Sequence, residues 1–257
     1  MILGVIQARM SSSRLPGKVL KPLLGVPMLG RQIERVRRAR RLDDLVIATS
    51  TGSADEAIAE LCQQLQVGCF RGSLDDVLDR FHGAAQAAAA DHVVRLTGDC
   101  PLSDPEIIDA VVALHLEGDY DYTSNAHPPT YPDGLDVEVV RFASLEKAWR
   151  QARLPSQREH VTPYLYEPGL FRTGNLSHDI DLSGLRWTVD EPEDFELIET
   201  IYRALHAELP EFLMADVLAL LERQTHLSAI NRGFERDEGY RRSTAAEARA
   251  PLPEERN

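Results

Sequence analysis

Three cations and three hydroxyls lie within ten residues, directly after the first apolar run of the chain. Residues 2–7 (ILGVIQ) are apolar, and the polar stretch that follows contains Arg9, Ser11, Ser12, Ser13, Arg14 and Lys18. A short apolar run that ends in such a loop is typical of a buried strand, and Pro16-Gly17 shapes the end of the loop. Cationic side chains and free backbone N–H groups at that place suit an anion, above all the phosphates of a nucleotide.

Two aspartates follow other predicted strands. Asp99 comes after the apolar run 92–97, and Asp190 comes after the run 185–189. Each alone is explained by a turn or a helix cap, and Glu193 and Asp194 are explained by the dipole of the helix that begins there. Two aspartates that face a phosphate-binding loop together suggest a site for Mg²⁺. This ion is commonly held by one or two carboxylates and by phosphates of the substrate.

The first hundred residues alternate between strand and helix patterns. Apolar runs at 2–7, 45–50, 67–70 and 92–97 predict buried strands, and amphipathic segments at about 28–40, 54–66 and 74–90 predict helices. This order predicts parallel βαβ units with helices on both faces of the sheet. Ligands of such sheets bind beyond the carboxyl ends of the strands, where this sequence becomes polar.

The pattern changes at about residues 118–185. Strand-like pieces at 120–124, 135–140 and 170–176 and helical segments at 142–153 and 156–166 surround a Pro-rich loop. We interpret this region as a small inserted β-rich part that forms the second half of a cleft. Helices at 191–206 and 214–223 complete a single domain, 1–233, and the polar residues 234–257 are expected to be a disordered tail.

Bulk composition excludes several classes of partner. The 257 residues carry a formal charge of −13, with 43% apolar and 27% charged residues. This balance argues against nucleic acid and anionic membrane as partners. Three cysteines without paired spacing suggest neither a disulfide framework nor a zinc site, so we expect a cytoplasmic protein. The arginines at 35, 37, 38, 40 and 41 are expected to form a solvated face.

Several segments resemble the sugar-acid cytidylyltransferases, the enzymes that activate Kdo, sialic acid and related acids as CMP-sugars. The segments are QARMSSSRLPGKVLKPLLGVPML (7–29), TGDCPL (97–102) and WTVDEPEDFELI (187–198). Further stretches resemble the spore-coat polysaccharide protein F branch, and they are RGSLDDVLDRF (71–81), YPDGLDVEVV (131–140), SQREHVTPYLY (156–166) and INRGFERDEGYRRS (230–243).

The resemblance implies a Rossmann-like GT-A-type nucleotidyltransferase fold and Mg²⁺-dependent transfer of CMP from CTP. It implies Asp99 and Asp190 as metal ligands, with Arg14 and Lys18 as catalytic cations beside them. The implied nucleotide contacts are Gln7, Ala8, Arg9, Ser11, Ser12, Arg14, Lys18, Arg71, Ser73, Thr97 and Gly98. Thr97 stands where Kdo synthetases have a base-reading Gln, so the choice of CTP over another NTP stays open.

The acceptor sugar acid is expected at the inserted region. The candidate residues are Tyr131, Asp136, Glu138, Arg158 and His160. We prefer Arg158 for a substrate carboxylate because its planar guanidinium matches that geometry. The resemblance also implies a homodimer.

Two other functions are compatible with the pattern. A glycosyltransferase of the same fold would hold a metal with an Asp-x-Asp motif, but Asp119-Tyr120-Asp121 precedes a predicted strand instead of following one. A non-catalytic nucleotide-binding subunit is the third possibility, although pure binding needs no pair of metal-ligating aspartates.

Overall fold

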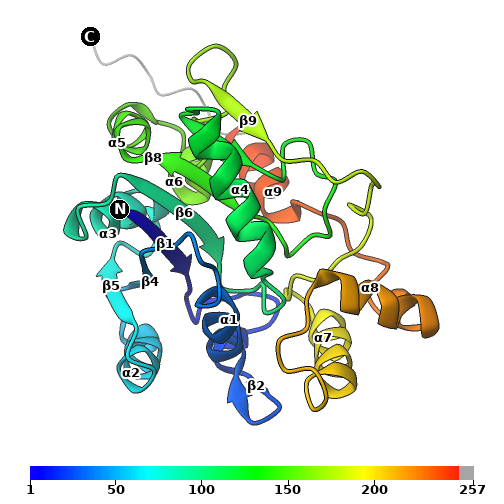
Figure 1. Cartoon of the computed structure of the whole chain (residues 1–257). Coiled ribbons are helices and arrows are strands. Elements are labelled where there is room, and N and C mark those ends of the chain that lie inside the picture. Colours follow the sequence, from blue (N-terminus) through cyan, green and yellow to red (C-terminus); the bar gives the residue numbers. More distant parts are fainter. Residues whose placement is uncertain (249–257) are drawn as a thin grey trace.

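The computed structural model of this chain describes residues 1–248 and has the expected mixed α/β architecture. Seven strands form one sheet in the order β5-β4-β1-β6-β8-β7-β9 (Figure 1). The strands are β1 (Ile2–Gln7), β4 (Asp44–Ser50), β5 (Gly68–Gly72), β6 (His92–Thr97), β7 (Tyr122–Ser124), β8 (Glu138–Arg141) and β9 (Thr173–Asn175). The first four in this list pair in parallel, which confirms the predicted βαβ order.

Apolar side chains alternate between the two faces of the sheet, because successive residues of a strand point to opposite sides. In β1, Leu3 and Val5 belong to one core cluster and Ile6 to the other, and all three are fully buried. The first cluster packs α3 (Val77–Ala87), α5 (Phe142–Gln151) and the end of α6 (Pro155–His160) onto the sheet. The second cluster packs α1 (Met28–Val36), α2 (Glu56–Gln64), α4 (Pro105–Glu117), α7 (Pro192–Leu205) and α8 (Met214–Arg223).

Short elements complete the described chain. They are the hairpin β2 (Pro22–Leu23) and β3 (Val26–Pro27), and the 3₁₀ turns η1 (Lys18–Leu20), η2 (Ser53–Asp55) and η3 (Leu227–Ala229). No helix within residues 1–248 is long and apolar enough to cross a membrane.

The inserted region extends the central sheet and does not form a β unit of its own. β8 pairs antiparallel with both β6 and β7, and β9 pairs parallel with β7. The prediction of a strand at 185–189 is wrong, because this segment contributes an isolated bridge, between Arg186 and Asp133, and not a strand of the sheet. The backbone N–H of Val189 nevertheless donates to the carbonyl of Asp99 over 2.8 Å, which places the two aspartate-bearing segments side by side.

Part of the segment that was expected to be a disordered tail, residues 234–257, is helical in the structure. Residues Glu238–Glu247 form helix α9, which packs against α6 (Figure 1), and the remaining expectation for 249–257 lies outside the described residues. No residue of α9 is fully buried. Polar contacts hold it instead: Ser156 of α6 donates through its hydroxyl to Glu247 over 2.8 Å.

The expected solvated arginine face is also wrong for Arg35. This side chain is 4% exposed, and its guanidinium donates to the carbonyls of Ser103 and Phe212, both over 2.9 Å. A run of arginines in the sequence hides which member points inward, because the partners of Arg35, which are Ser103 and Phe212, lie far along the chain, just before α4 and before α8.

Candidate active site

A two-part cleft lies at the carboxyl ends of the parallel strands. One part, here the loop cavity, has a volume of about 460 Å³ and is lined by the first polar loop, the end of β6 and residues of α9. The other, here the insertion cavity, has about 520 Å³ and is lined by residues 126–138, 160–166 and 235–240. The two share a wall, so a group bound in one can react with a group bound in the other. The wall consists of Gln7, Arg14, Arg95, Thr97, Asp99, His160, Asp190 and Gly239.

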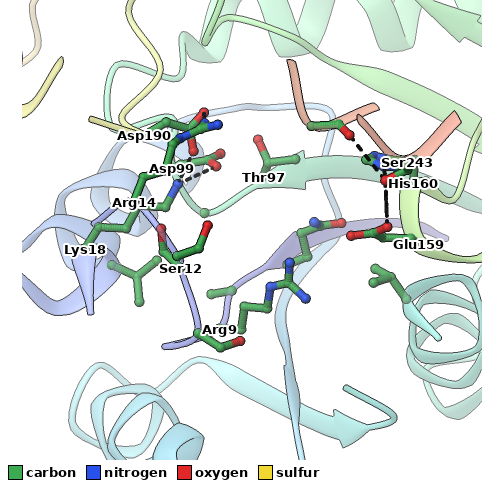
Figure 2. Close-up of a pocket in the computed structure, with 18 of the residues that line it drawn as sticks. Arg9, Ser12, Arg14, Lys18, Thr97, Asp99, Glu159, His160, Asp190 and Ser243 are labelled. Atoms are coloured by element: carbon green, nitrogen blue, oxygen red, sulfur yellow. Dashed lines mark hydrogen bonds and ion pairs between the residues drawn. The ribbon is translucent and has the colours of Figure 1, made fainter. Parts of the chain in front are cut away.

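One ammonium group, from the loop cavity, ties together two carboxylates of this wall. Lys18 Nζ donates to Asp99 Oδ2 over 2.9 Å, to Asp190 Oδ1 over 2.8 Å and to the carbonyl of Val189 over 2.7 Å. Figure 2 shows these side chains converging at one end of the loop cavity, with Arg14 beside them. The structure therefore brings together the loop cation and both strand-end aspartates, which are 81 and 172 residues away in sequence.

Charge fixes the protonation of this cluster. Burial alone would raise the pKa of Asp99, but the Lys18 ammonium outweighs it and lowers that pKa to about 2. Burial would likewise lower the pKa of Lys18, and the two aspartates instead raise it. Asp190 Oδ2 also forms ion pairs with Nη2 of Arg14 at 2.9 Å and with Nη2 of Arg186 at 3.3 Å. Two carboxylates flanked by cations are the kind of groups that suit a phosphate with its divalent cation.

The fold holds the first loop in place through backbone groups. Met10 N–H donates to the carboxylate of Asp55 over 2.7 Å, and Gly17 N–H donates to the carbonyl of Met10 over 3.1 Å. Gly17 has φ +71°, the left-handed conformation that lets the loop turn into η1. Lys18 is consequently presented toward β6 instead of solvent, and its side chain is 9% exposed.

The insertion cavity is lined by paired charges. Asp136 pairs with Arg236, Glu138 pairs with Arg95, and Glu138 also accepts from the hydroxyl of Tyr122 over 2.5 Å. Asp133 accepts from Arg186 over 3.1 Å. Burial, then the neighbouring Asp136 charge, raises the pKa of Asp133 to about 7, and burial raises that of Asp136 to about 6.

Helix α9 closes the far side of the cleft. Ser243 of α9 shares a hydrogen bond with His160 Nε2 over 3.0 Å and donates to Glu159 over 2.9 Å. Figure 2 shows this cluster across the cavity from Lys18 and the aspartates. Burial lowers the pKa of His160, so its imidazole is neutral at neutral pH.

The structure brings most of the predicted residues to the cleft. The loop cavity is lined by Gln7, Ala8, Arg9, Ser11, Ser12, Arg14, Lys18, Thr97, Gly98, Asp99 and Asp190, and Asp136, Glu138 and His160 line the insertion cavity. Arg71, Ser73, Tyr131 and Arg158 line neither cavity.

Local partners explain the placement of the two arginines. Arg158 donates to Asp76 Oδ2 from Nε over 2.9 Å and from Nη2 over 2.5 Å, and to the carbonyl of Trp149. Arg71 pairs with Glu56 and donates to the carbonyl of Ser50. A carboxylate of the chain already occupies the fork of Arg158, so the assignment of Arg158 to a substrate carboxylate stays a prediction that this structure does not support.

Tyr131 and Ser73 have structural partners of their own. Tyr131 is 8% exposed and packs edge-on against His178, with ring centroids 5.3 Å apart. The hydroxyl of Ser73 accepts from the N–H of Asp76 over 3.0 Å, just before α3 begins.

Sequence reasoning missed several residues that line the cleft. They are Arg80 and Arg95 within predicted elements, Glu159 beside His160, and Arg236, Arg242 and Ser243 in the expected tail. Arg95 alternates with apolar residues in β6, and a cation inside a buried strand was the one available signal. The tail residues carried only a polar composition, which gives no signal for a site.

The donor set of the cluster fits a hard divalent cation. Within residues 1–248 no three His, Cys, Asp or Glu side chains gather as a ready metal cage. Asp99 and Asp190 supply two carboxylates that meet on one ammonium, and Mg²⁺ completes such a pair with substrate phosphates and water. The residues therefore fit a metal that arrives with its nucleotide.

Comparison with known proteins shows the family of this chain. The family model described as cytidylyltransferase matches residues 3–216. This chain belongs to the cytidylyltransferase family. The spore coat polysaccharide biosynthesis protein SpsF of Bacillus subtilis is 38% identical over 232 residues, which cover 86% of this chain and 94% of that protein.

Solved structures share the fold. A cytidylyltransferase from Leptospira borgpetersenii superposes with a TM-score of 0.86 at 32% identity, covering 91% of this chain and 99% of that one. A CMP:2-keto-3-deoxy-manno-octonic acid synthetase solved with CTP gives a TM-score of 0.60 at 20% identity, covering 79% and 98%. The latter likeness supports the fold alone.

Proposed function

We propose that this chain transfers CMP from CTP to a sugar acid, with release of pyrophosphate, in the biosynthesis of a surface polysaccharide. The observation that carries this proposal is that Lys18, in the loop cavity, bonds to Asp99 and Asp190 in the wall between the two cavities. A nucleotide in the loop cavity would place its α-phosphate at that cluster, and an acceptor in the insertion cavity would reach it from the other side. Family membership and the name of the B. subtilis relative support the reaction class and the pathway.

The proposed reaction is an in-line displacement. A hydroxyl oxygen of the acceptor forms a bond to the α-phosphorus and gives its proton to solvent water. The bond from that phosphorus to the bridging oxygen breaks, and pyrophosphate leaves with the electron pair of that bond. Such a reaction asks the protein mainly for positioning and charge stabilisation. Arg14 and Lys18 stand at the cluster to neutralise charge on the leaving group.

The proposed cofactor is Mg²⁺, held by Asp99 and Asp190. When bound, it would polarise the α-phosphate and offset its negative charge. Lys18 bonds to both carboxylates and turns them toward one point, so the chain itself orients the two ligands.

The two alternative functions have less support. For a glycosyltransferase, the Asp119-Tyr120-Asp121 motif is misplaced: Asp119 is 77% exposed and pairs with Arg141, and none of the three residues lines either cavity. A non-catalytic binding subunit would leave the paired aspartates unexplained.

Incubation of the chain with CTP, Mg²⁺ and a panel of sugar acids tests the proposal. We expect pyrophosphate release that depends on one acceptor, and Asp99→Asn should lower it by about 10²–10³. Asp181→Asn is the matched control, because Asp181 is exposed and, among residues 1–248, its side chain bonds only to Ser183. Transfer of sugar from a supplied nucleotide-sugar, or CTP binding without turnover, would contradict the proposal.

Assembly and compartment remain proposals as well. We propose a cytoplasmic homodimer, on the family resemblance and on three cysteines that are all free in the structure. Light scattering should give twice the mass of one chain, and a monomer at every concentration would contradict the dimer.

A further inference from the structure

Arg186 lines the insertion cavity, but the chain itself takes up all of its donors. Its side chain is 9% exposed, and a guanidinium carries five N–H groups. Nε and Nη2 donate to the two oxygens of Asp194, both over 3.0 Å. Nη1 donates to Asp133 Oδ2 over 3.1 Å and to the carbonyl of Glu235 over 3.2 Å, and Nη2 also donates to Asp190 Oδ2 over 3.3 Å. Arg186 therefore acts on other residues of the site and not on a ligand.

Asp194 is the fixed partner of this arginine. Its side chain is fully buried, and its two oxygens meet Nε and Nη2 of Arg186 in the paired geometry that makes an arginine–carboxylate contact specific as well as strong. Asn231 donates to Asp194 Oδ1 over 2.8 Å and to the carbonyl of Arg186 over 2.9 Å. The backbone N–H groups of Asp190 and Glu191 donate to Asp194 Oδ2, both over 2.9 Å. Asp194 thus does more than offset the dipole of α7.

Asp190 is held by this pair at both its backbone and its side chain. Its N–H bonds to Asp194 and its Oδ2 bonds to Arg186, whereas its Oδ1 faces Lys18. The side chain of Asp190 is 27% exposed at the cleft, so burial alone does not fix its rotamer. The direction of the Asp190 carboxylate therefore depends on the groups that bond to it.

We infer that Arg186 is a positioning residue, which together with Asp194 holds the Asp190 carboxylate in the orientation that a divalent cation requires. This inference rests on the proposed function. Residues that hydrogen-bond to a metal-ligating carboxylate commonly change metal affinity by about 10- to 100-fold when they are replaced. Arg14 and Lys18 also contact Asp190, but they lie in the loop cavity among the groups proposed to meet the nucleotide. Arg186 and Asp194 do not line that cavity, so their contribution is the position of Asp190.

Calorimetric titration of CTP, with Mg²⁺ and with EDTA, tests this role without turnover. In the wild type Mg²⁺ should strengthen CTP binding, and the ratio of the two dissociation constants measures this Mg²⁺ gain. Arg186→Lys keeps the charge but cannot bond to Asp194, Asp133 and Asp190 together. The variant should lose about 10- to 100-fold of the Mg²⁺ gain, while CTP affinity in EDTA should stay within about twofold. Arg35→Lys is the matched control and should change neither constant, because Arg35 is buried and carbonyl-bound but lines neither cavity.

A double variant tests whether Arg186 acts through Asp190. Asp190→Asn alone should reduce the Mg²⁺ gain. Addition of Arg186→Lys should then change the gain by no more than about twofold, because the orientation of a ligand that has been removed no longer matters. Losses that multiply in the double variant would overturn the inference, as would a full Mg²⁺ gain in Arg186→Lys.

The remaining outcomes distinguish this inference from the proposed function. If Arg186→Lys weakens CTP equally with Mg²⁺ and with EDTA, the inference is wrong and the proposed function stands. If Arg186→Lys does not fold, Asp194→Asn takes its place with the same expectation and the same contradiction, because it keeps the shape of Asp194 and removes the charge that holds Arg186. If Mg²⁺ gives no gain in the wild type, the proposed cofactor and the inference fail together.

Discussion

Arg14 of the first loop contacts Glu238 of α9, with Nη1 3.2 Å from Oε2, although the two residues are 224 positions apart. The same guanidinium pairs with Asp190 at 2.9 Å and with Glu191 at 2.6 Å. The C-terminal helix is thus joined directly to the cation that stands at the proposed reaction centre. Because the family model ends at residue 216, this contact involves a part of the chain that the family model does not include.

Removal of residues 234–257 should abolish most activity and leave the core intact. No residue of α9 is fully buried, so the melting temperature should change by only a few degrees, about what 1 kcal/mol produces in a domain of this size. The cleft would lose a wall, and kcat/KM should fall by about 10²-fold or more. Steady-state kinetics beside thermal melts check both parts, and full activity of the truncated chain would show that α9 is dispensable.

Lys18→Met should leave Asp99 and Asp190 as neighbouring carboxylates without their shared ammonium. We expect kcat to fall by about 10²–10³, because the charge that faces the leaving group is lost. Lys147→Met is the control, since Lys147 lies over the ring of Phe171 outside both cavities. Equal turnover in both variants would exclude Lys18 from the reaction.

Arg158→Lys should lower stability without changing acceptor binding. Lysine cannot reproduce the two bonds to Asp76 together with the bond to the carbonyl of Trp149, so the free energy of unfolding should fall by about 1–2 kcal/mol. Urea denaturation and the KM for the acceptor measure the two effects. A raised KM with unchanged stability would restore Arg158 as a substrate-binding residue.

Stability should depend on pH through Asp133. The pKa of Asp133 is about 7 in the folded chain and near 3.8 in the unfolded chain. Between about pH 3.8 and pH 7 the folded state therefore keeps a proton on this carboxyl that the unfolded state has lost. The stabilisation from this group is fully present below about pH 3.8 and is lost as the pH rises through about 7. Asp133→Asn, which mimics the protonated form, should therefore gain stability relative to wild type at both pH values, and the gain should be larger at pH 8 than at pH 5 by about 1–2 kcal/mol. Urea denaturation at both pH values checks this, and an equal effect at both would contradict it.

The sheet and half of the cleft follow from the sequence for a simple geometric reason. Carboxyl ends of parallel strands meet at one edge, so the loops after β1 and β6 had to lie together, and Lys18 and Asp99 with them. The apolar runs that form these strands are strong local signals.

Other parts of the site have no local signal. The guanidinium of Arg158 was interpreted as available for a substrate carboxylate, because its partner, Asp76, is 82 residues earlier in the chain. Helix α9 has no apolar stripe and is held by polar contacts such as Ser243 with His160, so its sequence is that of a solvated tail. Arg80 on α3 lines the loop cavity, and nothing nearby in sequence shows that its face of the helix turns inward.

Label transfer from CTP tests the central claim most directly. The chain is incubated with Mg²⁺, a sugar-acid panel and CTP labelled either at the α- or at the γ-phosphate. Cytidylyl transfer across the Asp99–Asp190 cluster predicts that the α-label appears in a CMP-sugar and the γ-label in pyrophosphate, both only when an acceptor is present. Release of the γ-label as inorganic phosphate, or no α-label in any sugar product, would contradict it.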